Sequence, residues 1–308
     1  MTGEAGPGET RPMPRATLNG GIELEYDVVG SVDGTPLLLV MGFTAQLIAW
    51  QDGFCEQLAK HGFRVIRFDN RDCGLSTKFD GVSVDIGLVL EAALGGQPDK
   101  LPQLPYTLSD MADDAVGLLD HLGIDRAHIA GASMGGMIVQ QMAIEHPTRV
   151  RSMTSIMSTT GEPGFGSPMP EAAQVLLAPP PEGRDDYVES SVKYSVWQSK
   201  RWFDPVEVKA LAARSYDRSF YPEGAQRQLG AIYATGSRAA GLAKLEVPTL
   251  VIHGRDDTLI APSGGERTAE LVPRSSLLML ADMGHDIPQP LWPTVTGAIA
   301  AHAKLADA

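Results

Sequence analysis

The 308-residue sequence is poor in cysteine and in positive charge and has no long apolar run, and each shortage excludes a class of protein. Its two cysteines, Cys55 and Cys73, form no Cys-x-x-Cys pair, so neither a zinc site of that type nor a disulfide framework is predicted. A net charge of −13 argues against nucleic acid and anionic membranes as partners. The sequence contains no run of about 18 apolar residues, so no membrane span is predicted.

The beginning of the chain also lacks the apolar core of a secretory signal. Residues 1–17 are polar and contain several glycines and prolines, so we expect a disordered tail there. Because the thiols are few and no signal is visible, we expect a cytoplasmic protein. No metal-ligand spacing is present, and we predict neither a bound metal nor a cofactor. The sequence does not define the oligomeric state.

Strand-like and helix-like patterns alternate through most of the remaining chain. The half-apolar stretch 22–28 predicts an antiparallel strand at the sheet edge, and the apolar run 36–40 predicts a strand covered on both faces. Further strands are predicted at 64–68, 128–130, 150–157, 248–252 and 276–280. Helical patterns lie between them, which predicts an α/β fold with a mostly parallel sheet and helices on both faces.

Two stretches interrupt this alternation. Residues 79–106 are punctuated by Gly and Pro and predict a loop with one short helix near 86–93. Residues 161–238 show helical patterns without clear strands, which predicts a helical cap inserted into a core formed by residues 18–160 and 239–308. Ten of the chain's 19 aromatic residues fall in this cap, and two interpretations stay open: they line an apolar pocket, or they fill the cap's own core. They are Phe165, Tyr187, Tyr194, Trp197, Trp202, Phe203, Tyr216, Phe220, Tyr221 and Tyr233.

One short stretch combines a strand, a sharp turn and a helix. The apolar residues 128–130 lead into Gly-Ala-Ser-Met-Gly at 131–135, and a helical pattern continues to Pro147. A serine on a strained strand-to-helix turn needs neighbours without bulky side chains, which Gly131 and Gly135 supply. Gly-x-Ser-x-Gly in this setting predicts that Ser133 is a nucleophile. The alternative interpretation is a glycine-rich turn that only packs a helix against the sheet.

Two later loops offer an acid and a base to such a serine. Asp256 and Asp257 follow the predicted strand at 248–252, and His285 follows the strand at 276–280, behind a glycine. Loops at the carboxyl ends of parallel strands meet at one edge of the sheet. A serine hydroxyl needs a base during attack, histidine can take and return the proton, and a carboxylate orients the ring. We therefore predict a Ser–acid–His set; the other six histidines lie where packing, capping or surface roles are favoured.

Five stretches together resemble one family. The chain resembles the serine α/β-hydrolases, in particular the branch of aclacinomycin methylesterases and actinobacterial lipases and esterases. The matching stretches are LLLVMGF at 37–43, FRVIRFDNRDCGLST at 63–77, IAGASMGGM at 129–137, VPTLVIHGRDD at 247–257 and MGH at 283–285. The resemblance implies the chain order Ser, acid, His and, through its Gly-x-x-Asp pattern, Asp257 rather than Asp256 as the acid.

The resemblance also implies an oxyanion hole made of two backbone N–H groups. One belongs to Met134, directly after the nucleophile, and the other to Phe43, in the turn after the first buried strand. Relatives often begin that turn with histidine, where this chain has Met41. A backbone donor does not depend on that side chain, so we expect the hole to be retained.

The function implied is cofactor-independent hydrolysis of a carboxylic ester, with an apolar small molecule as substrate and an acyl-enzyme as intermediate. Two alternatives remain: a perhydrolase or cofactor-free haloperoxidase with the same residues, and a non-catalytic small-molecule binding protein on the same fold. Serine at the nucleophile position argues against an epoxide hydrolase or a haloalkane dehalogenase, whose members use aspartate there. The motifs leave the acyl group and the alcohol open.

Overall fold

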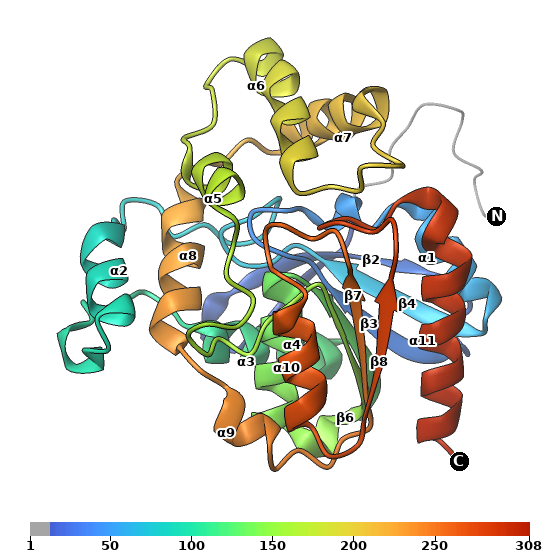
Figure 1. Ribbon diagram of the computed structural model, residues 1–308. Coiled ribbons are helices and arrows are strands. Elements are labelled where there is room, and N and C mark those ends of the chain that lie inside the picture. Colours follow the sequence, from blue (N-terminus) through green and yellow to red (C-terminus); the bar gives the residue numbers. More distant parts are fainter. Residues whose placement is uncertain (1–12) are drawn as a thin grey trace.

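A computed structural model describes residues 13–308 and has an eight-stranded sheet at its centre (Figure 1). The strand order is β1-β2-β4-β3-β5-β6-β7-β8, and β3 to β8 are all parallel. The mostly parallel α/β sheet predicted from the sequence is therefore confirmed. The strands are β1 Arg15–Thr17, β2 Glu23–Val29, β3 Thr35–Val40, β4 Phe63–Phe68, β5 Ala127–Ala132, β6 Val150–Ile156, β7 Thr249–Gly254 and β8 Ser275–Leu280.

The antiparallel edge differs from the prediction in one respect. Residues 15–17, which were assigned to a disordered tail, form β1 and pair with β2, so β1 and not the predicted strand at 22–28 occupies the edge. Ala16 is completely buried, and the Arg15 guanidinium donates to the Glu25 carboxylate across the pair at 3.0 Å. These contacts with the neighbouring strand give a short polar segment an order that its composition does not reveal. Residues 1–12 of the expected tail lie outside the described chain.

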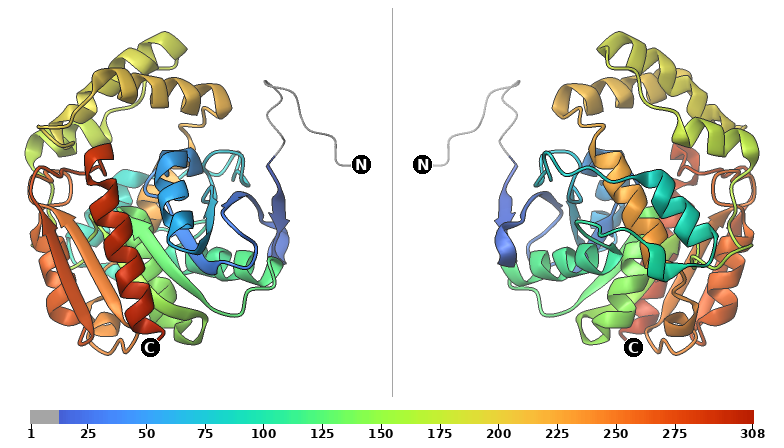
Figure 2. Two further views of the ribbon diagram at one scale, coloured as in Figure 1. Left: turned by 90° about the vertical axis from the view of Figure 1, so that its right-hand side faces the viewer. Right: turned by 90° about the vertical axis from the view of Figure 1, so that its left-hand side faces the viewer.

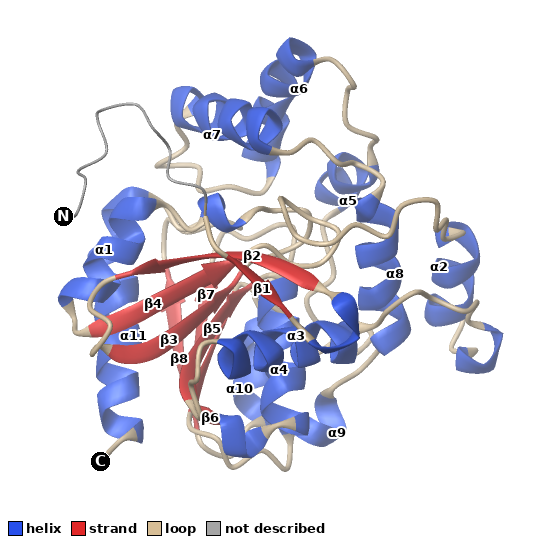
Figure 3. Ribbon diagram, turned by 180° about the vertical axis from the view of Figure 1, so that it is seen from behind, coloured by secondary structure: helices blue, strands red, loops and turns tan. Residues whose placement is uncertain are grey.

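Helices cover both faces of the sheet, as the alternation predicts (Figures 2 and 3). On β3, Leu37 and Leu39 face the side covered by α1 and α11, while Leu38 and Val40 face the side covered by α3 and α4. A strand buried on both sides must be apolar throughout, which explains its unbroken hydrophobic run. The helices are α1 Asp52–Lys60, α2 Ile86–Leu94, α3 Leu108–His121, α4 Met134–Glu145, α5 Pro170–Leu177, α6 Arg184–Ser190, α7 Pro205–Arg218, α8 Gly224–Thr235, α9 Ala239–Leu242, α10 Ser263–Leu271 and α11 Trp292–Ala306.

The segment 161–238, here named the cap segment, lies between β6 and β7 and contains α5 to α8 without a strand. Helices α5, α6 and α7 lie above the carboxyl ends of the parallel strands, whereas α8 runs beside α2 (Figures 1 and 2). The buried Arg238 joins the two ends of this segment: its N–H donates to the Thr160 carbonyl at 2.8 Å and its Nη2 to the Thr159 carbonyl at 2.9 Å. Within residues 13–308, no helix combines the length and apolarity that crossing a membrane requires.

Candidate active site

Ser133 lies at the sharp turn between β5 and α4, with φ 58° and ψ −122°. Left-handed backbone is uncommon for a residue with a side chain, and the surrounding packing must hold it. The neighbouring glycines make the turn possible, because a Cβ on Gly135 would lie 2.1 Å from the Val40 carbonyl oxygen and one on Gly131 2.1 Å from the Gly135 oxygen. The turn thereby presents the hydroxyl at the carboxyl ends of β3 and β5.

The structure brings Ser133, His285 and Asp257 into one hydrogen-bonded line. His285 Nε2 lies 2.9 Å from the Ser133 hydroxyl, and His285 Nδ1 lies 2.7 Å from Asp257 Oδ2. Asp256 points elsewhere: its N–H donates to the Met283 carbonyl at 3.0 Å, and its carboxylate makes no hydrogen bond or ion pair within residues 13–308. Of the two adjacent aspartates, only Asp257 reaches the imidazole.

The Asp257 carboxylate is buried and fully engaged. Its Oδ1 accepts the N–H groups of Leu259 and Ile260, both at 2.9 Å, while Oδ2 faces His285. Burial alone would raise its pKa, but the charges and hydrogen bonds of His285 and His253 lower the pKa to about 2. The acid is therefore ionised at neutral pH and can support a positive charge on the imidazole.

Sequence reasoning treated His253 as a packing residue and missed its contact with the acid. Its Nε2 donates to the Ile260 carbonyl at 2.9 Å and lies 3.5 Å from Asp257 Oδ2. In the sequence, only the spacing of four residues between His253 and Asp257 indicated that the two side chains could meet. This histidine fixes the loop on which the carboxylate stands.

The two predicted oxyanion donors flank the serine. A Cβ on Gly42 would lie 3.0 Å from the Ser133 Cβ, so the turn that carries Phe43 lies directly against Ser133. Met134 is the first residue of α4, where N–H groups have no partner within the helix. The Phe43 and Met134 N–H groups both lack an acceptor within residues 13–308.

The cap segment makes hydrogen bonds to residues 282–286, the loop that carries His285, through polar groups that belong to no sequence motif. The His285 N–H donates to the Trp197 carbonyl at 2.6 Å, and the Ser199 N–H donates to the Asp286 carboxylate at 2.8 Å. The Ser199 hydroxyl also donates to the Asp282 carbonyl at 2.6 Å. These contacts hold the backbone on either side of the imidazole against the segment that lies over it.

The turn after β4 makes hydrogen bonds within itself and buried ion pairs with other parts of the chain. The Asp72 carboxylate pairs with Arg227 of α8 at 2.7 Å, and Asp69 pairs with Arg218 of α7 at 2.6 Å. Burial raises the pKa of the Cys73 thiol in this turn, which keeps it a neutral, unreactive group. Both ion pairs tie the core to the cap segment rather than closing the turn on itself.

Asp286 gives the site a pH-dependent contribution to stability. Burial raises its pKa to about 6, against the N–H groups of Ser199 and Gly284 and the charge of His285, which lower it. A carboxyl whose folded pKa lies above its unfolded value stabilises the fold at low pH, and the fold loses this stabilisation between about pH 4 and pH 6. The free energy of unfolding of Asp286→Asn should therefore rise relative to the wild type across that window, by up to about 3 kcal/mol.

Urea unfolding of both proteins between pH 4 and pH 7 measures this difference. Asp282→Asn is the control, because that carboxylate pairs with Arg201 at the surface. A difference between Asp286→Asn and the wild type that stays flat over the whole range contradicts the prediction.

Comparison with known proteins places this geometry in a family. A family model described as "alpha/beta hydrolase fold" matches residues 35–288. The chain is 26% identical to rhodomycin D methylesterase DauP from Streptomyces sp. (strain C5), over 92% of this chain and 96% of that protein. It is 28% identical to the putative carbamate hydrolase RutD from Azorhizobium caulinodans, over 85% and 87% of the two chains.

Among solved structures, the chain is similar to a thermophilic esterase from Thermogutta terrifontis. The TM-score is 0.71 at 26% identity, covering 95% of this chain and 98% of that one. The resemblance to the methylesterase branch inferred from the five sequence stretches is confirmed, at modest identity. Because the family model spans most of the chain and the sheet has the expected order of strands and loops, this protein belongs to the α/β-hydrolase fold family.

Proposed function

We propose that this protein is a carboxylic ester hydrolase that acts through Ser133, His285 and Asp257. The observation that carries the proposal is the continuous line of hydrogen bonds, 2.9 Å from serine to imidazole and 2.7 Å from imidazole to carboxylate. The similarity to a methylesterase over nearly the whole of both chains supports ester chemistry in particular.

The proposed reaction has two halves. His285 Nε2 removes the hydroxyl proton as Ser133 Oγ attacks the ester carbonyl, and ionised Asp257 stabilises the imidazolium that forms. The N–H groups of Phe43 and Met134 stabilise the oxyanion of the tetrahedral intermediate. The imidazolium then gives its proton to the departing alcohol, which leaves an acyl-enzyme. Water, which gives a proton to the same histidine, attacks the acyl carbonyl. The bond to Ser133 Oγ then breaks, the histidine returns the proton to that oxygen, and the carboxylic acid leaves.

The proposed substrate is a small apolar ester covered by the cap segment. Trp197 packs with Leu259 and Ala172 in a small apolar cluster, so an aromatic of the cap lies against the loop of the acid. Tyr194 stacks on Trp197 with ring centroids 5.2 Å apart. A second aromatic cluster, Tyr187 with Tyr216 and Phe220, packs on itself within the cap. The first cluster contacts the loop of Asp257 through Leu259, and it is the better candidate for substrate contact.

Ser133→Ala should fold normally and lose on the order of 10⁴ to 10⁶ in kcat with p-nitrophenyl acetate, because no other group supplies the nucleophile. A fluorophosphonate probe should label Ser133 alone, as read by peptide mass spectrometry. Ser152→Ala, which alters a buried serine of β6, is the matched control and should keep its activity. Labelling at another serine, or substantial turnover by Ser133→Ala, contradicts the mechanism.

Asp257→Asn and Asp256→Asn test which aspartate serves as the acid. Asparagine at 257 misorients the ring and leaves its positive form unsupported, so kcat should fall by up to about 10⁴. Asparagine at 256 should change kcat little, since that carboxylate has no partner in the described structure. Steady-state kinetics of the two variants side by side decide the assignment, and the reverse result would move the acid by one residue.

Tyr194→Leu should change the ranking of esters more than it changes turnover of an acetate ester. The measurement is kcat/KM over p-nitrophenyl esters from acetate to palmitate, together with polyketide methyl esters and lactones. Tyr216→Leu is the control, because that side chain is held within the cap by its hydroxyl, which donates to the Glu182 carbonyl. If kcat/KM of Tyr194→Leu fell by one common factor for all substrates, the Tyr194 ring would have a packing role alone.

A further inference from the structure

The proposed oxyanion donor Phe43 lies in a tight turn from Gly42 to Ala45. The Ala45 N–H donates to the Gly42 carbonyl at 3.2 Å and closes the turn. Thr44, the third residue, has φ 55°, while Phe43 is not among the residues with positive φ. A turn of this type prefers glycine or asparagine at its third position. Threonine holds that conformation only if its surroundings enforce it.

The direction of the Phe43 N–H follows from this turn. The Gly42 carbonyl and the Phe43 N–H belong to one planar trans peptide, so they point in opposite directions. The contact that holds the Gly42 oxygen toward Ala45 therefore turns the Phe43 N–H away from the turn. The hydrogen bond from Ala45 to Gly42 forms only while Thr44 keeps its left-handed conformation. A contact that stabilises Thr44 in that conformation therefore also stabilises the direction of the Phe43 N–H.

Gln228 of α8 supplies such a contact. The Thr44 N–H donates to Gln228 Oε1 at 2.8 Å, and Gln228 Nε2 donates to the Arg71 carbonyl at 2.9 Å. The Gln228 side chain is completely buried, so both ends of its amide are used away from water. The Cys73 thiol lies 3.2 Å from the Thr44 carbonyl and holds the other side of the same residue.

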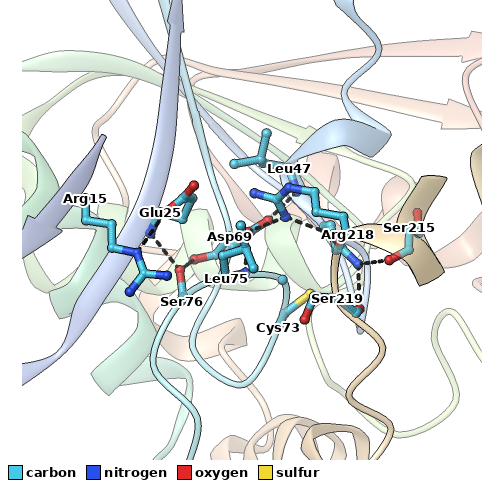
Figure 4. Close-up of polar contacts among 12 residues, drawn as sticks. Arg15, Glu25, Leu47, Asp69, Cys73, Leu75, Ser76, Ser215, Arg218 and Ser219 are labelled. Carbon is cyan, nitrogen blue, oxygen red and sulfur yellow. Dashed lines mark hydrogen bonds and ion pairs between the residues drawn. The ribbon is translucent and has the colours of Figure 1, made fainter. Parts of the chain in front are cut away.

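A second attachment follows the turn (Figure 4). Asp69 accepts the Leu47 N–H at 2.7 Å and pairs with Arg218 of α7 at 2.6 Å. The Gln46 amide donates to the carbonyls of Ser215 and Ser219, at 2.7 and 2.9 Å, at the end of the same helix. In the segment 44–47, Thr44 is therefore held by α8, and Gln46 is held at the end of α7.

We propose that Gln228 is a positioning residue for the oxyanion hole, which fixes the Phe43 N–H by holding Thr44. The inference rests on the proposed ester hydrolysis. It assigns α8 a part in catalysis: the helix completes one half of the oxyanion hole from outside the strand-and-turn motif that carries the donor. Gln228 itself touches neither the serine nor the oxyanion.

Gln228→Met keeps the length of the side chain and removes both hydrogen bonds. Its matched control is Gln140→Met, because Gln140 is also fully buried and makes two hydrogen bonds, to Ser155 and Arg238, away from the turn. Four quantities are measured for both: kcat and KM with p-nitrophenyl acetate, inhibition by a trifluoromethyl ketone, amide exchange of a peptide covering residues 41–47, and the melting temperature.

We expect Gln228→Met to lose about tenfold to 10² in kcat with little change in KM, since removal of an oxyanion donor outright costs about 10² to 10³. Affinity for the ketone should fall by a similar factor, and exchange at 41–47 should accelerate. Gln140→Met should lower the melting temperature while leaving kcat and exchange at 41–47 near wild type. If Gln228→Met does not fold, Gln228→Asn replaces it, because the shorter amide cannot reach both partners.

The outcomes separate the two proposals. Wild-type kcat and ketone affinity in a folded Gln228 variant, with an active parent enzyme, would overturn the positioning role alone. Equal losses in the Gln228 and Gln140 variants that follow their melting temperatures would also overturn it. A wild-type protein that hydrolyses no ester and reacts with no fluorophosphonate would sink the proposed function, and the oxyanion role of Gln228 with it.

Discussion

The close contact between the Ser133 turn and the end of β3 is the constraint on which the rest of the site depends. The Val40 carbonyl and the position where Gly135 would carry a Cβ are only 2.1 Å apart, so α4 can start here only with glycine at that residue. This contact sets the serine at the edge where the loops after β3, β7 and β8 meet. Phe43, Asp257 and His285 lie near one another because each belongs to a loop at the carboxyl end of a parallel strand, and the sheet brings these loop positions to one edge.

Converging loops still have to be held at the correct distance, and buried polar contacts do this. Asp257 has all its oxygen atoms engaged, and Asp69 and Asp72 are each paired with an arginine of the cap segment. Ion pairs of this kind contribute less to net stability than their short distances suggest, because both charges leave water. Their larger effect is on geometry, since a buried charge tolerates few alternative arrangements. The core and the cap segment therefore share one polar framework around the site.

The sequence predicted the parts of this arrangement that depend on local patterns. The strand, sharp turn and helix around Ser133 were predicted from its glycines and the flanking patterns, and the other strands from their apolar runs. Asp257 was selected over Asp256 only through family resemblance, since both follow the same strand. Gln228, Ser199 and Arg218 were not found, because these partners lie 87 to 184 residues away and a single glutamine, serine or arginine in a helical segment has no distinctive pattern. Strand β1 was missed because three residues within a polar stretch form no apolar pattern, and its order comes from pairing with β2, where Arg15 contacts Glu25.

Some parts of the cap segment bond to the loops of the proposed site and others do not, so changes in different parts affect the site backbone differently. Helices α7 and α8 and the Trp197–Ser199 stretch bond directly to the turn after β3 and to the histidine loop. A change of shape at those positions must move groups beside the proposed nucleophile. Helix α6 contacts α7 and makes no hydrogen bond to either loop within the described residues, so its residues act on the site backbone through neighbouring parts of the cap segment. The attached part of the cap segment is therefore constrained by the same contacts that aim the proposed catalytic groups.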